Sequence, residues 1–594
     1  SLWEWREGNY PLPTGVKADI TSCFSGGGSG PKDDPFRIRT KQDLEWLSAL
    51  TNLGWRFDNQ YVLLENDIEL NAPFEEWGTT APTLWHPIGR SVSEKTPASS
   101  ANFEYEFRGT FDGGFHSVRN MYLNDVTGET PQGFFGIING AVIKNLSVEG
   151  AWIKAVGSTG ILVGKSTRYC MPTNILQCHT SGTAEGSWAA GGIMGAISLD
   201  GITNIINCSS AAVLVPGEYG AHMVVGDQNY IGGTAYSNDT VANYLFTGRM
   251  EDDPGSFFGK EISINCYYDM EKWVRPDKWT GIETYGRTTE YLQSKEFANV
   301  FNYYVAQYNE RHADSPLRWW QRNEGNYPTL TETKPPHTVT YITNSAATYT
   351  PQPVLDDSRI LPPPVPEEEG RMFYGWFTDE SMTKPYIFDT VQITSSFALY
   401  AKWQEELVPD FTPFTNPFAT TYVISTPEQL LGFSRAVQGV EGVIDQMNFV
   451  GKTVKLGADI MLNDTSGWQL WGGYTYGRQW EPISTDEVYC AFGGTFDGDG
   501  HTISGMYISD DSHSDATGDG IGLFARLRPD AVVKNVNIKA SRIIFTSRYG
   551  QVGLLVGFNR GTVDSCHVEG EIEVVRCTAG MIAGVCRKSY DGIV

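Results

Sequence analysis

Gly160-Ile161-Leu162-Val163-Gly164 is a short apolar stretch bracketed by glycine, and stretches of this kind recur along the chain. Alternating segments that end in a polar residue run between the recurrences, and the step from Asn145 to Cys178 is 33 residues. The next step, from Cys178 to Cys208, is 30 residues. A period near 30 with short strands, glycine turns and no helical stretch is typical of a β-solenoid. The related stretches are Gly133-Phe134-Phe135-Gly136, Gly192-Ile193-Met194-Gly195, Gly522-Leu523-Phe524, Gly553-Leu554-Leu555-Val556-Gly557 and Gly580-Met581-Ile582-Ala583-Gly584.

One coil of this kind cannot bury its apolar face alone. Stacking the coils about 4.8 Å apart pairs each strand with the strand of the next coil and lines a continuous core. Glycine is expected at the corners, where the chain turns through positive φ or packs closely. We therefore predict an all-β fold built from right-handed parallel β-helix (solenoid) domains.

The chain also repeats itself on a larger scale, because residues 36–195 recur as residues 422–584. Gly109-Thr110-Phe111-Asp112-Gly113 parallels Gly494-Thr495-Phe496-Asp497-Gly498, and both continue to a histidine. These parallels predict two copies of one solenoid domain, at 36–330 and 422–594, the second truncated.

The remaining segments are assigned from composition and from short repeats. Glu7-Gly8-Asn9-Tyr10-Pro11 reappears as Glu324-Gly325-Asn326-Tyr327-Pro328, so residues 1–13 are expected to be the tail of a preceding copy in a longer array. Proline-rich and glycine-rich breaks predict linkers. The linkers fall at 14–35, 331–338 and 404–421 and leave a small module at 339–403.

Each solenoid is expected to carry a short helix that covers its N-terminal end, because an open end would template aggregation. Leu44, Leu47 and Leu50 share one helical stripe. Thr40 with Asp43 reads as a capping box. In the second copy the cap is Thr426, with Pro427 at the first helical position and Gln429 completing the box.

Composition and charge indicate which partners and which membrane segments to expect. The 594 residues carry 70 acidic and 44 basic side chains, a formal net charge of -26. Such a chain repels phosphate and anionic lipid, so we expect neither nucleic acid nor membrane insertion. No apolar run reaches the length of a transmembrane helix, and the first residues lack the pattern of a signal peptide. An export signal and an anchor, if the protein is exported, are expected outside this sequence.

The glycine-bracketed motif, together with the Gly-Thr-Phe-Asp-Gly and Asp-Ile-x-Leu-Asn stretches, resembles the GLUG-motif proteins over roughly residues 36–330 and 422–594. That family consists of large exported bacterial surface proteins, including adhesins and the non-catalytic parts of some immunoglobulin-A peptidases. The resemblance implies an extracellular, cell-surface location.

Residues 339–403 resemble the internalin-type B repeat, also called the Listeria–Bacteroides repeat, a β-grasp-like module. Phe373-Tyr374-Gly375-Trp376-Phe377-Thr378-Asp379 and Phe397-Ala398-Leu399-Tyr400-Ala401-Lys402-Trp403 carry the resemblance. The first turn departs from the family, since Thr343-Asn344-Ser345 replaces the usual Asn-Gly-Gly. Such modules act as spacers or interaction units in surface proteins.

Two groups of carboxylates invite a functional interpretation. Asp112 and Asp497 lie in Phe-Asp-Gly turns, where we favour a carboxylate that bonds its own backbone over an acid in a catalytic pair. The acidic stretch at 510–519 is a candidate Ca²⁺ loop, although Arg526 stands where a standard calcium loop has its bidentate Glu, and we favour a solvated loop. Its candidate ligands are Asp511, Asp515 and Asp519.

Cysteines recur at one phase of the repeat, directly after Asn, Gln or Ser, which predicts an inward ladder of buried thiols. The residues are Cys178, Cys208, Cys266 and Cys566. Disulfides between stacked neighbours, between Cys577 and Cys586, or between Cys170 and Cys178 are the alternative.

Aromatic residues in the loops offer stacking surfaces for sugars, with core packing as the alternative. The candidates are Trp85, Trp471 and Trp480, with Trp77 and Trp468 nearby. We expect a non-catalytic surface adhesin or stalk that presents a rigid β-helix to a glycan or a surface protein. The alternatives are a carbohydrate-active β-helix enzyme and an accessory region of a large exported peptidase.

Overall fold

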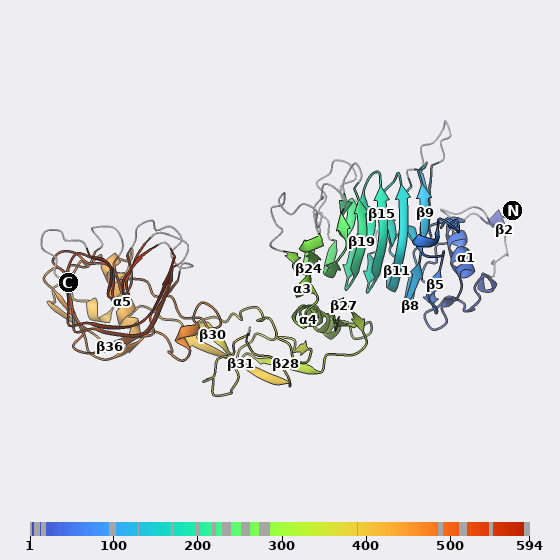
Figure 1. Cartoon of the computed structure of the whole chain (residues 1–594). Coiled ribbons are helices and arrows are strands. Elements are labelled where there is room, and N and C mark those ends of the chain that lie inside the picture. The colour runs from blue at the N-terminus through green and yellow to red at the C-terminus, as the bar shows by residue number, and fades with distance from the viewer. Residues whose placement is uncertain are drawn as a thin grey trace. The chain divides into compact units, whose positions relative to one another are not determined.

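The chain folds into two compact units, seen in a computed structural model (Figure 1). The first unit comprises residues 1–337 and 352–358, and the second comprises residues 338–351 and 359–594. The domain boundaries predicted from the sequence are finer than this division and stay predictions. The structure describes residues 3–4, 12–13, 20–93, 102–126, 128, 130–167, 172–197, 202–216, 221–227, 239–250, 262–272, 285–388, 390–484, 491–509, 520–545, 550–575 and 577–586.

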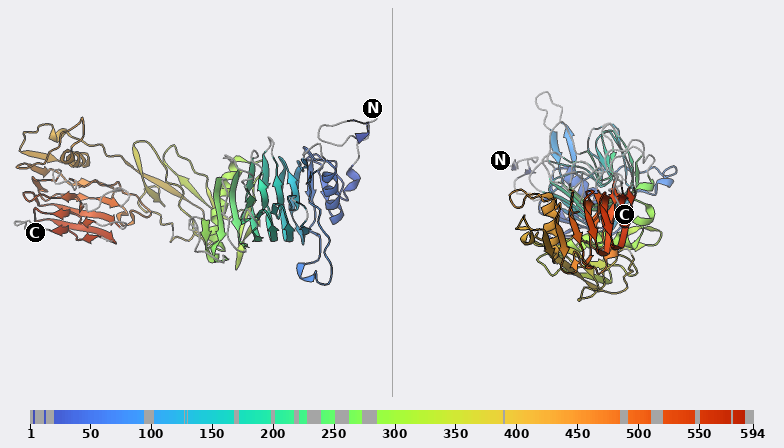
Figure 2. Two further views of the ribbon diagram at one scale, coloured as in Figure 1. Left: turned by 90° about the horizontal axis from the view of Figure 1, so that it is seen from above. Right: turned by 90° about the vertical axis from the view of Figure 1, so that its left-hand side faces the viewer.

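The first unit contains a stack of parallel strands in which neighbours come from successive coils of the chain (Figures 1 and 2). We call it stack 1. One long sheet runs along it, and two narrower parallel sheets, of four and of three strands, complete its middle coils. The long sheet contains β3 (Phe36–Ile38), β4 (Tyr61–Leu64), β5 (Ile68–Glu69), β8 (Thr110–Arg119), β9 (Tyr122–Asp125), β11 (Val142–Ala155), β14 (Thr173–Leu176), β15 (His179–Gly186), β18 (Thr203–Ile206), β19 (Ser209–Val215), β22 (Thr240–Phe246), β23 (Arg249–Met250), β24 (Ile262–Asp269) and β25 (Gly286–Arg287). The narrower sheets are β10 (Phe135–Ile138), β13 (Val163–Ser166), β17 (Met194–Ile197) and β21 (Val225–Asp227), and β12 (Thr159–Gly160), β16 (Ala190–Gly191) and β20 (Ala221–His222).

The register places like residues on top of one another. Ile143 pairs with Ile175, Ile175 with Ile205, and Ile205 with Val241, and all four side chains are buried. Each coil thus adds one rung to an apolar ladder, and burial of about 25 cal/mol per Å² of apolar surface stabilises the stack. The prediction of a mostly β chain with parallel sheets is confirmed.

A polar ladder marks one corner of stack 1. Asn145, Gln177, Asn207, Asn243 and Asn265 all adopt left-handed backbone angles, with φ between 54° and 58°. Asparagine tolerates this conformation better than other residues with a side chain. Gln177 Nε2 donates to Asn145 Oδ1 (2.8 Å), and Asn265 Nδ2 donates to Asn243 Oδ1 (2.7 Å).

The bracketing glycines serve a different purpose from this corner. A Cβ on Gly160 would lie 2.4 Å from the backbone nitrogen of Gly195, and a Cβ on Gly164 would lie 2.6 Å from the backbone nitrogen of Gln132. Neither glycine has a positive φ. Glycine is therefore required here for the close approach of neighbouring coils, while the amide side chains supply the left-handed corner.

Helix α1 (Lys41–Asn52) begins with the predicted capping box. Thr40 Oγ1 accepts from Asp43 N, and the Asp43 carboxylate accepts from Thr40 N. Helix α5 (Pro427–Gln438) has Thr426 as its N-cap, as predicted. Its box differs, because Gln429 Oε1 accepts from the backbone nitrogen of Ser425, one residue earlier than expected.

Beyond the predicted helix at the N-terminal end, residues 36–330 contain a long helix that the repeat pattern does not predict. Helix α4 (Lys295–Arg311) follows the short α3 (Thr289–Leu292), begins at the cap Ser294 and lies beside β24 (Figure 1). Its buried side chains Phe297 and Phe301 pack with Tyr267 of β24 and with Trp320. Trp320 belongs to a hairpin that ends the first unit's main segment, formed by β26 (Trp319–Asn323) and β27 (Asn326–Thr331).

The second unit contains a second stack of parallel strands, stack 2, with its own buried core (Figure 2). The aligned residues Val454, Phe496 and Val533 form its ladder. Its strands are β32 (Thr421–Ile424), β33 (Thr453–Leu456), β34 (Ile460–Met461), β35 (Thr495–Asp497), β36 (Thr502–Ser504), β37 (Tyr507–Ser509), β38 (Gly520–Ile521), β39 (Phe524–Arg526), β40 (Val532–Lys534), β41 (Asn537–Phe545), β42 (Gln551–Val552), β43 (Val556–Asn559), β44 (Thr562–Asp564), β45 (His567–Val574), β46 (Thr578–Ala579) and β47 (Ala583–Cys586).

A small β module precedes stack 2 in the same unit. Strand β31 (Phe397–Glu405) pairs in parallel with β28 (His337–Ile342) and antiparallel with β30 (Arg371–Phe377). At the turn that departs from the family, Asn344 has φ 52°, so an asparagine takes the left-handed position. Among the described residues no helix is long and apolar enough to span a membrane.

The module is seated on stack 2 through an aromatic core. Tyr374 and Phe377 of β30 pack with Trp471 and Tyr507 of the stack, and all four are nearly or fully buried. Trp471 Nε1 donates to Tyr374 Oη at 3.2 Å. Burial raises the pKa of Tyr374 to about 12. This contact buries the two aromatic side chains of the module against Trp471 and Tyr507.

Candidate functional site on the flank of stack 1

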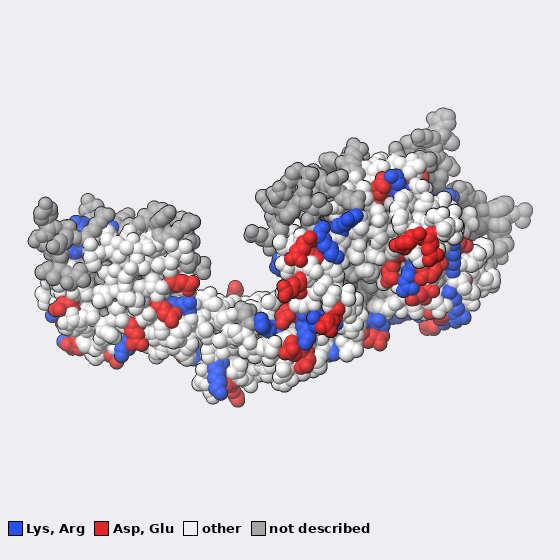
Figure 3. Space-filling model, viewed as in Figure 1, with Lys and Arg blue, Asp and Glu red and all other residues white. Residues whose placement is uncertain are grey.

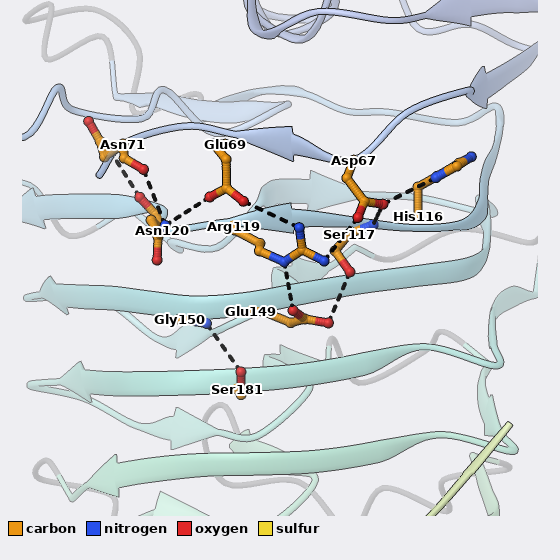
Figure 4. Close-up of polar contacts among 10 residues, drawn as sticks. All are labelled: Asp67, Glu69, Asn71, His116, Ser117, Arg119, Asn120, Glu149, Gly150 and Ser181. Atoms are coloured by element: carbon orange, nitrogen blue, oxygen red, sulfur yellow. Dashed lines mark hydrogen bonds and ion pairs between the residues drawn. The ribbon is translucent and has the colours of Figure 1, made fainter. Parts of the chain in front are cut away.

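Charged side chains from three successive coils meet on the flank of stack 1 (Figure 4). Arg119 lies at the centre and makes ion pairs with Asp67 (3.0 Å), Glu69 (3.2 Å) and Glu149 (2.9 Å). We call these four residues with His116 the flank cluster. They come from β5, β8 and β11 and from the turn before β5, so the parallel register brings together residues about 30 to 50 positions apart. On the face seen in Figure 3, acidic and basic atoms of the first unit lie beside one another.

The hydrogen bonds of Asp67 favour its ionised form. Above all the backbone N–H of Ser117, which donates to Asp67 Oδ1 at 3.0 Å, lowers the pKa of Asp67, and Arg119 lowers it further. The bond to Glu149 is the main cause that raises the pKa of Arg119. A general acid must hold a proton at the working pH, and this arrangement opposes that. The geometry therefore suits a clamp between coils.

The equivalent flank of stack 2 retains only part of this arrangement. His501 Nδ1 lies 3.1 Å from Asp459 Oδ1, just as His116 Nδ1 lies 3.1 Å from Asp67 Oδ1. The place of Arg119 is taken by Ser504. The histidine–aspartate contact is thus shared by both stacks, whereas the arginine with its carboxylates belongs to stack 1.

The aspartates of the two Phe-Asp-Gly turns bond to their own backbone, as the favoured interpretation predicts. Asp112 Oδ1 accepts from Gly114 N at 3.0 Å, and Asp497 Oδ1 accepts from Asp499 N at 3.0 Å. Each also accepts from the asparagine of the neighbouring coil, at Asn145 (2.8 Å) and Asn535 (3.0 Å). Each aspartate thus links its own turn to the asparagine corner of the next coil.

A run of four aromatic rings lies on the same flank, beyond the corner that follows Arg119. Trp152 stacks on Tyr122 with ring centroids 5.4 Å apart, Tyr122 contacts Trp77 (5.0 Å), and Trp77 contacts Phe74 (5.1 Å). Phe74 is 55% exposed, and the other three are partly buried. We call these residues the aromatic face. A continuous run of rings that reaches the surface marks a binding surface more often than four scattered rings would.

The three tryptophans predicted as sugar-stacking residues are buried, and the core-packing alternative is correct for them. Trp85 stacks on Phe134 (5.2 Å, 8° between planes) and donates from Nε1 to Phe134 O. Trp480 donates in the same way to Leu523 O, and Trp471 belongs to the contact with the module. Such side chains have no free face for a ligand.

The predicted ladder of buried thiols is confirmed for three of its four cysteines, whereas Cys566 is only partly buried. Cys178, Cys208 and Cys266 are buried thiols that form no disulfide. No disulfide joins Cys577 and Cys586, so the alternative proposed for this pair is not formed. Burial raises the pKa of the Cys178 thiol well above its usual value. Cys170 lies outside the described residues.

The candidate calcium ligands Asp511, Asp515 and Asp519 also lie outside the described residues. Within the described part of the chain, no group of three or more His, Cys, Asp or Glu side chains has the geometry to hold a metal ion. The calcium loop therefore stays a prediction.

A cavity of about 780 Å³ opens beside the aromatic face, between α1 and β9. Its size falls in the range of small-molecule sites, roughly 300–1,000 Å³. Polar groups on the wall of this cavity already form hydrogen bonds within the protein. Lys41 Nζ donates to Leu70 O (2.7 Å), and Asp125 accepts from Gln132 Nε2 (3.0 Å). Leu84, which is 47% exposed, lies on the wall and forms a parallel β-bridge with Tyr122.

The sequence pointed to Trp77 but not to the flank cluster or to the other rings of the aromatic face. The residues of each are far apart in the chain, and only the register of the coils unites them. A usable signal existed for one pair, because Tyr122 and Trp152 occupy the same phase of successive coils, 30 positions apart.

Parts of the chain are similar to known proteins over short lengths. Halomucin of Haloquadratum walsbyi is 27% identical over 185 residues, which is 31% of this chain and 2% of that protein. A provisionally named membrane protein of Evansella cellulosilytica is 37% identical over 68 residues, which is 11% of this chain and 10% of that protein. The chain thus spans a small part of the length of these curated relatives.

A solved structure from Bacteroides ovatus, provisionally named an immunoglobulin A1 protease, is 16% identical to this chain with a TM-score of 0.30. The match covers 52% of this chain and 96% of that one. The identity is too low for an activity to be transferred. The GLUG resemblance of residues 36–330 and 422–594 stays a prediction. Residues 337–402 match the Listeria-Bacteroides repeat domain, which confirms the resemblance of the module between the two stacks.

Proposed function

We propose that this chain is a non-catalytic segment of an exported cell-surface protein. In this proposal both stacks are right-handed parallel β-helices that act as a rigid stalk, and stack 1 presents the aromatic face to a glycan or a protein. The observation that carries the stalk is the in-register ladder, in which Ile143, Ile175 and Ile205 repeat one buried position coil after coil. The Listeria-Bacteroides repeat domain and the membrane-protein name of one relative support a location at the cell surface.

The binding role rests on the aromatic face. Partly exposed indole and phenol rings supply large contact area at low entropic cost, and they stack on sugars or pack against apolar side chains. The net charge of -26 favours a neutral or basic ligand over an anionic one. The engagement of Asp67, Glu69 and Glu149 with Arg119 supports a structural role for the charged residues beside that face.

The test applies the purified chain to arrays of neutral and acidic glycans and of bacterial and host surface proteins. A ligand that binds the chain should lose at least tenfold in affinity when Trp77 and Trp152 are both replaced by alanine. Trp46→Ala is the matched control, because Trp46 is 45% exposed on α1 of the same unit, outside the aromatic face. Equal affinity for both variants would reject the aromatic face as the binding surface.

A carbohydrate-active β-helix enzyme is the second candidate, favoured by the convergence of three carboxylates on one flank. An enzyme of this kind would release reducing sugar from polysaccharides. The rate of release should then fall by two orders of magnitude or more in Glu149→Gln. We expect no turnover above that of the heat-denatured chain. Release that depends on Glu149 would overturn the non-catalytic proposal.

A further inference from the structure

The two stacks share one loop that leaves the coil and returns to it at equivalent places. In stack 1, Asn71 Oδ1 accepts from Thr83 N, and Asn71 Nδ2 donates to Asn120 O. In stack 2, Asn463 Oδ1 accepts from Arg478 N, and Asn463 Nδ2 donates to Gly505 O. The same four bonding groups therefore anchor the loop of residues 72–82 and the loop of residues 464–477.

The strand next to each loop is equivalent as well. Trp85 N donates to Tyr122 O (2.8 Å), and Trp480 N donates to Tyr507 O (2.7 Å). Tyr122 and Tyr507 thus occupy the same place on their stacks. Each contacts a tryptophan of the anchored loop, Trp77 in stack 1 and Trp471 in stack 2.

The surroundings of the two tyrosines differ. Around Tyr507 the β module is seated, and its Tyr374 and Phe377 bury Trp471 completely. Around Tyr122 the rings of the aromatic face remain partly exposed, with Phe74 at 55%. Stack 1 therefore presents the same kind of surface that stack 2 covers with a Listeria-Bacteroides repeat domain.

Charge supports the same occupant. Lys402 of the module makes an ion pair with Asp464 (2.8 Å) in the loop of stack 2. The corresponding loop of stack 1 carries Glu75 and Glu76, both exposed. These two carboxylates lie four and five residues after the anchor Asn71, beside Trp77, and they give the loop the negative charge that a lysine of the module would pair with.

We propose that the aromatic face of stack 1 is a docking surface for the repeat module of a second copy of this chain. The proposal deepens the proposed function, on which it rests, by naming the partner of that face. Docking in trans uses the same module residues as docking on stack 2, so the two compete. A tethered module has an effective concentration on the order of mM, which keeps most chains closed on themselves at low concentration.

Sedimentation velocity of the full chain tests the proposal, from about 1 µM to about 1 mM, a range that reaches this effective concentration. Trp471→Ala with Asp464→Ala removes the indole and the carboxylate that hold the module on stack 2, so that Tyr507 remains there as the aromatic contact. The variant leaves Tyr374, Phe377 and Lys402 of the module intact. The freed module should then dimerise the chain at least tenfold more tightly than in the unaltered protein. Asp464→Asn alone is the milder variant, with a smaller shift in the same direction, should the double variant fold poorly.

Two additions to the freed variant locate the contact. Trp77→Ala with Trp152→Ala should abolish the dimer, whereas Trp46→Ala should leave it unchanged. A freed variant that is folded by circular dichroism yet no more dimeric than the unaltered chain would overturn the proposal, as would a dimer that survives loss of Trp77 and Trp152. If the chain does not self-associate, the proposed function can still hold. The glycan and protein arrays measure binding of other molecules, and the polysaccharide assay measures catalysis.

Discussion

Trp320 Nε1 donates a hydrogen bond of 2.6 Å to Asn207 Oδ1, although 113 residues separate them. The backbone beside this tryptophan completes the polar ladder, since Arg318 N donates to Gln177 Oε1 and Asn207 Nδ2 donates to Arg318 O. The hairpin that follows α4 therefore supplies the link between two coils that their own side chains do not make. It ties the end of the first unit's main segment to the middle of stack 1.

This link predicts the effect of removing the indole donor. Trp320→Phe keeps most of the buried ring and loses the hydrogen bond, so unfolding of the first unit should become easier by about 1–2 kcal/mol. The measurement is the urea midpoint followed by circular dichroism. Trp319→Phe is the matched control, since the neighbouring ring is only partly buried. Equal midpoints for both variants would contradict the role of the bond.

The polar corner predicts a ranking of substitutions at Asn243, which is fully buried with φ 54°. Asn243→Ala loses the amide bonds and also strains the backbone, at a cost of about 2–4 kcal/mol. Asn243→Gly loses the same bonds but adopts the left-handed angle freely, so it should be milder by about 1 kcal/mol. Chemical unfolding of both variants checks the order. Alanine equal to glycine would mean that backbone conformation plays no part.

The flank cluster predicts a dependence on pH. The pKa of Asp67 is lowered in the folded chain, so its contribution is present above the ordinary aspartate pKa of about 3.9. It is lost as the pH falls through the lower, folded-state value. Asp67→Asn should therefore lower the melting temperature at pH 7, by an amount equivalent to less than about 1 kcal/mol at this half-exposed site, and the difference should vanish in acid.

Asp33→Asn is the control for that measurement, because Asp33 is an exposed aspartate of the same unit. Its melting temperature should follow the unaltered chain at both pH values. A difference at Asp67 that grows as the pH falls would show that the sign of the effect has been assigned wrongly.

The thiol ladder predicts selective labelling. Cys178 and Cys208 are buried, and burial raises the pKa of Cys178, so neither presents an accessible thiolate at pH 7. Cys586 is exposed. A maleimide should modify Cys586 at least a hundredfold faster than Cys178 or Cys208 in the native chain, and equally fast in urea. Peptide mapping by mass spectrometry reads each site, and rapid native labelling of Cys178 would contradict the packed ladder.

The sequence predicts much of the fold because its repeats are regular. The steps of 33 and 30 residues between Asn145, Cys178 and Cys208 set the length of a coil, and Thr40 with Asp43 marks the start of α1. Helix α4 was missed even though Phe297, Phe301 and Val305 follow at helical spacing after Ser294. Its pattern is that of any amphipathic helix, and the period of about 30 residues predicts strands in this segment instead.

The candidate site was much harder to predict. Asp67, Arg119 and Glu149 gain their relation only from the register, and Trp471 is buried only because another domain covers it. A side chain on a loop has the same local sequence whether it meets solvent or a neighbouring domain. For that reason Trp471 and Trp77 were indistinguishable before the structure.

The register of the coils is the claim on which everything else depends, and cross-linking of paired cysteines measures it directly. Thr183 of β15 lies opposite Val213 of β19, both on the outer side of the sheet, whereas Ala211 lies two residues out of register with Thr183. With a bifunctional thiol reagent that spans about 5 Å, Thr183→Cys with Val213→Cys should cross-link at least tenfold faster than Thr183→Cys with Ala211→Cys. Equal rates, or faster linking of the offset pair, would contradict the parallel stack.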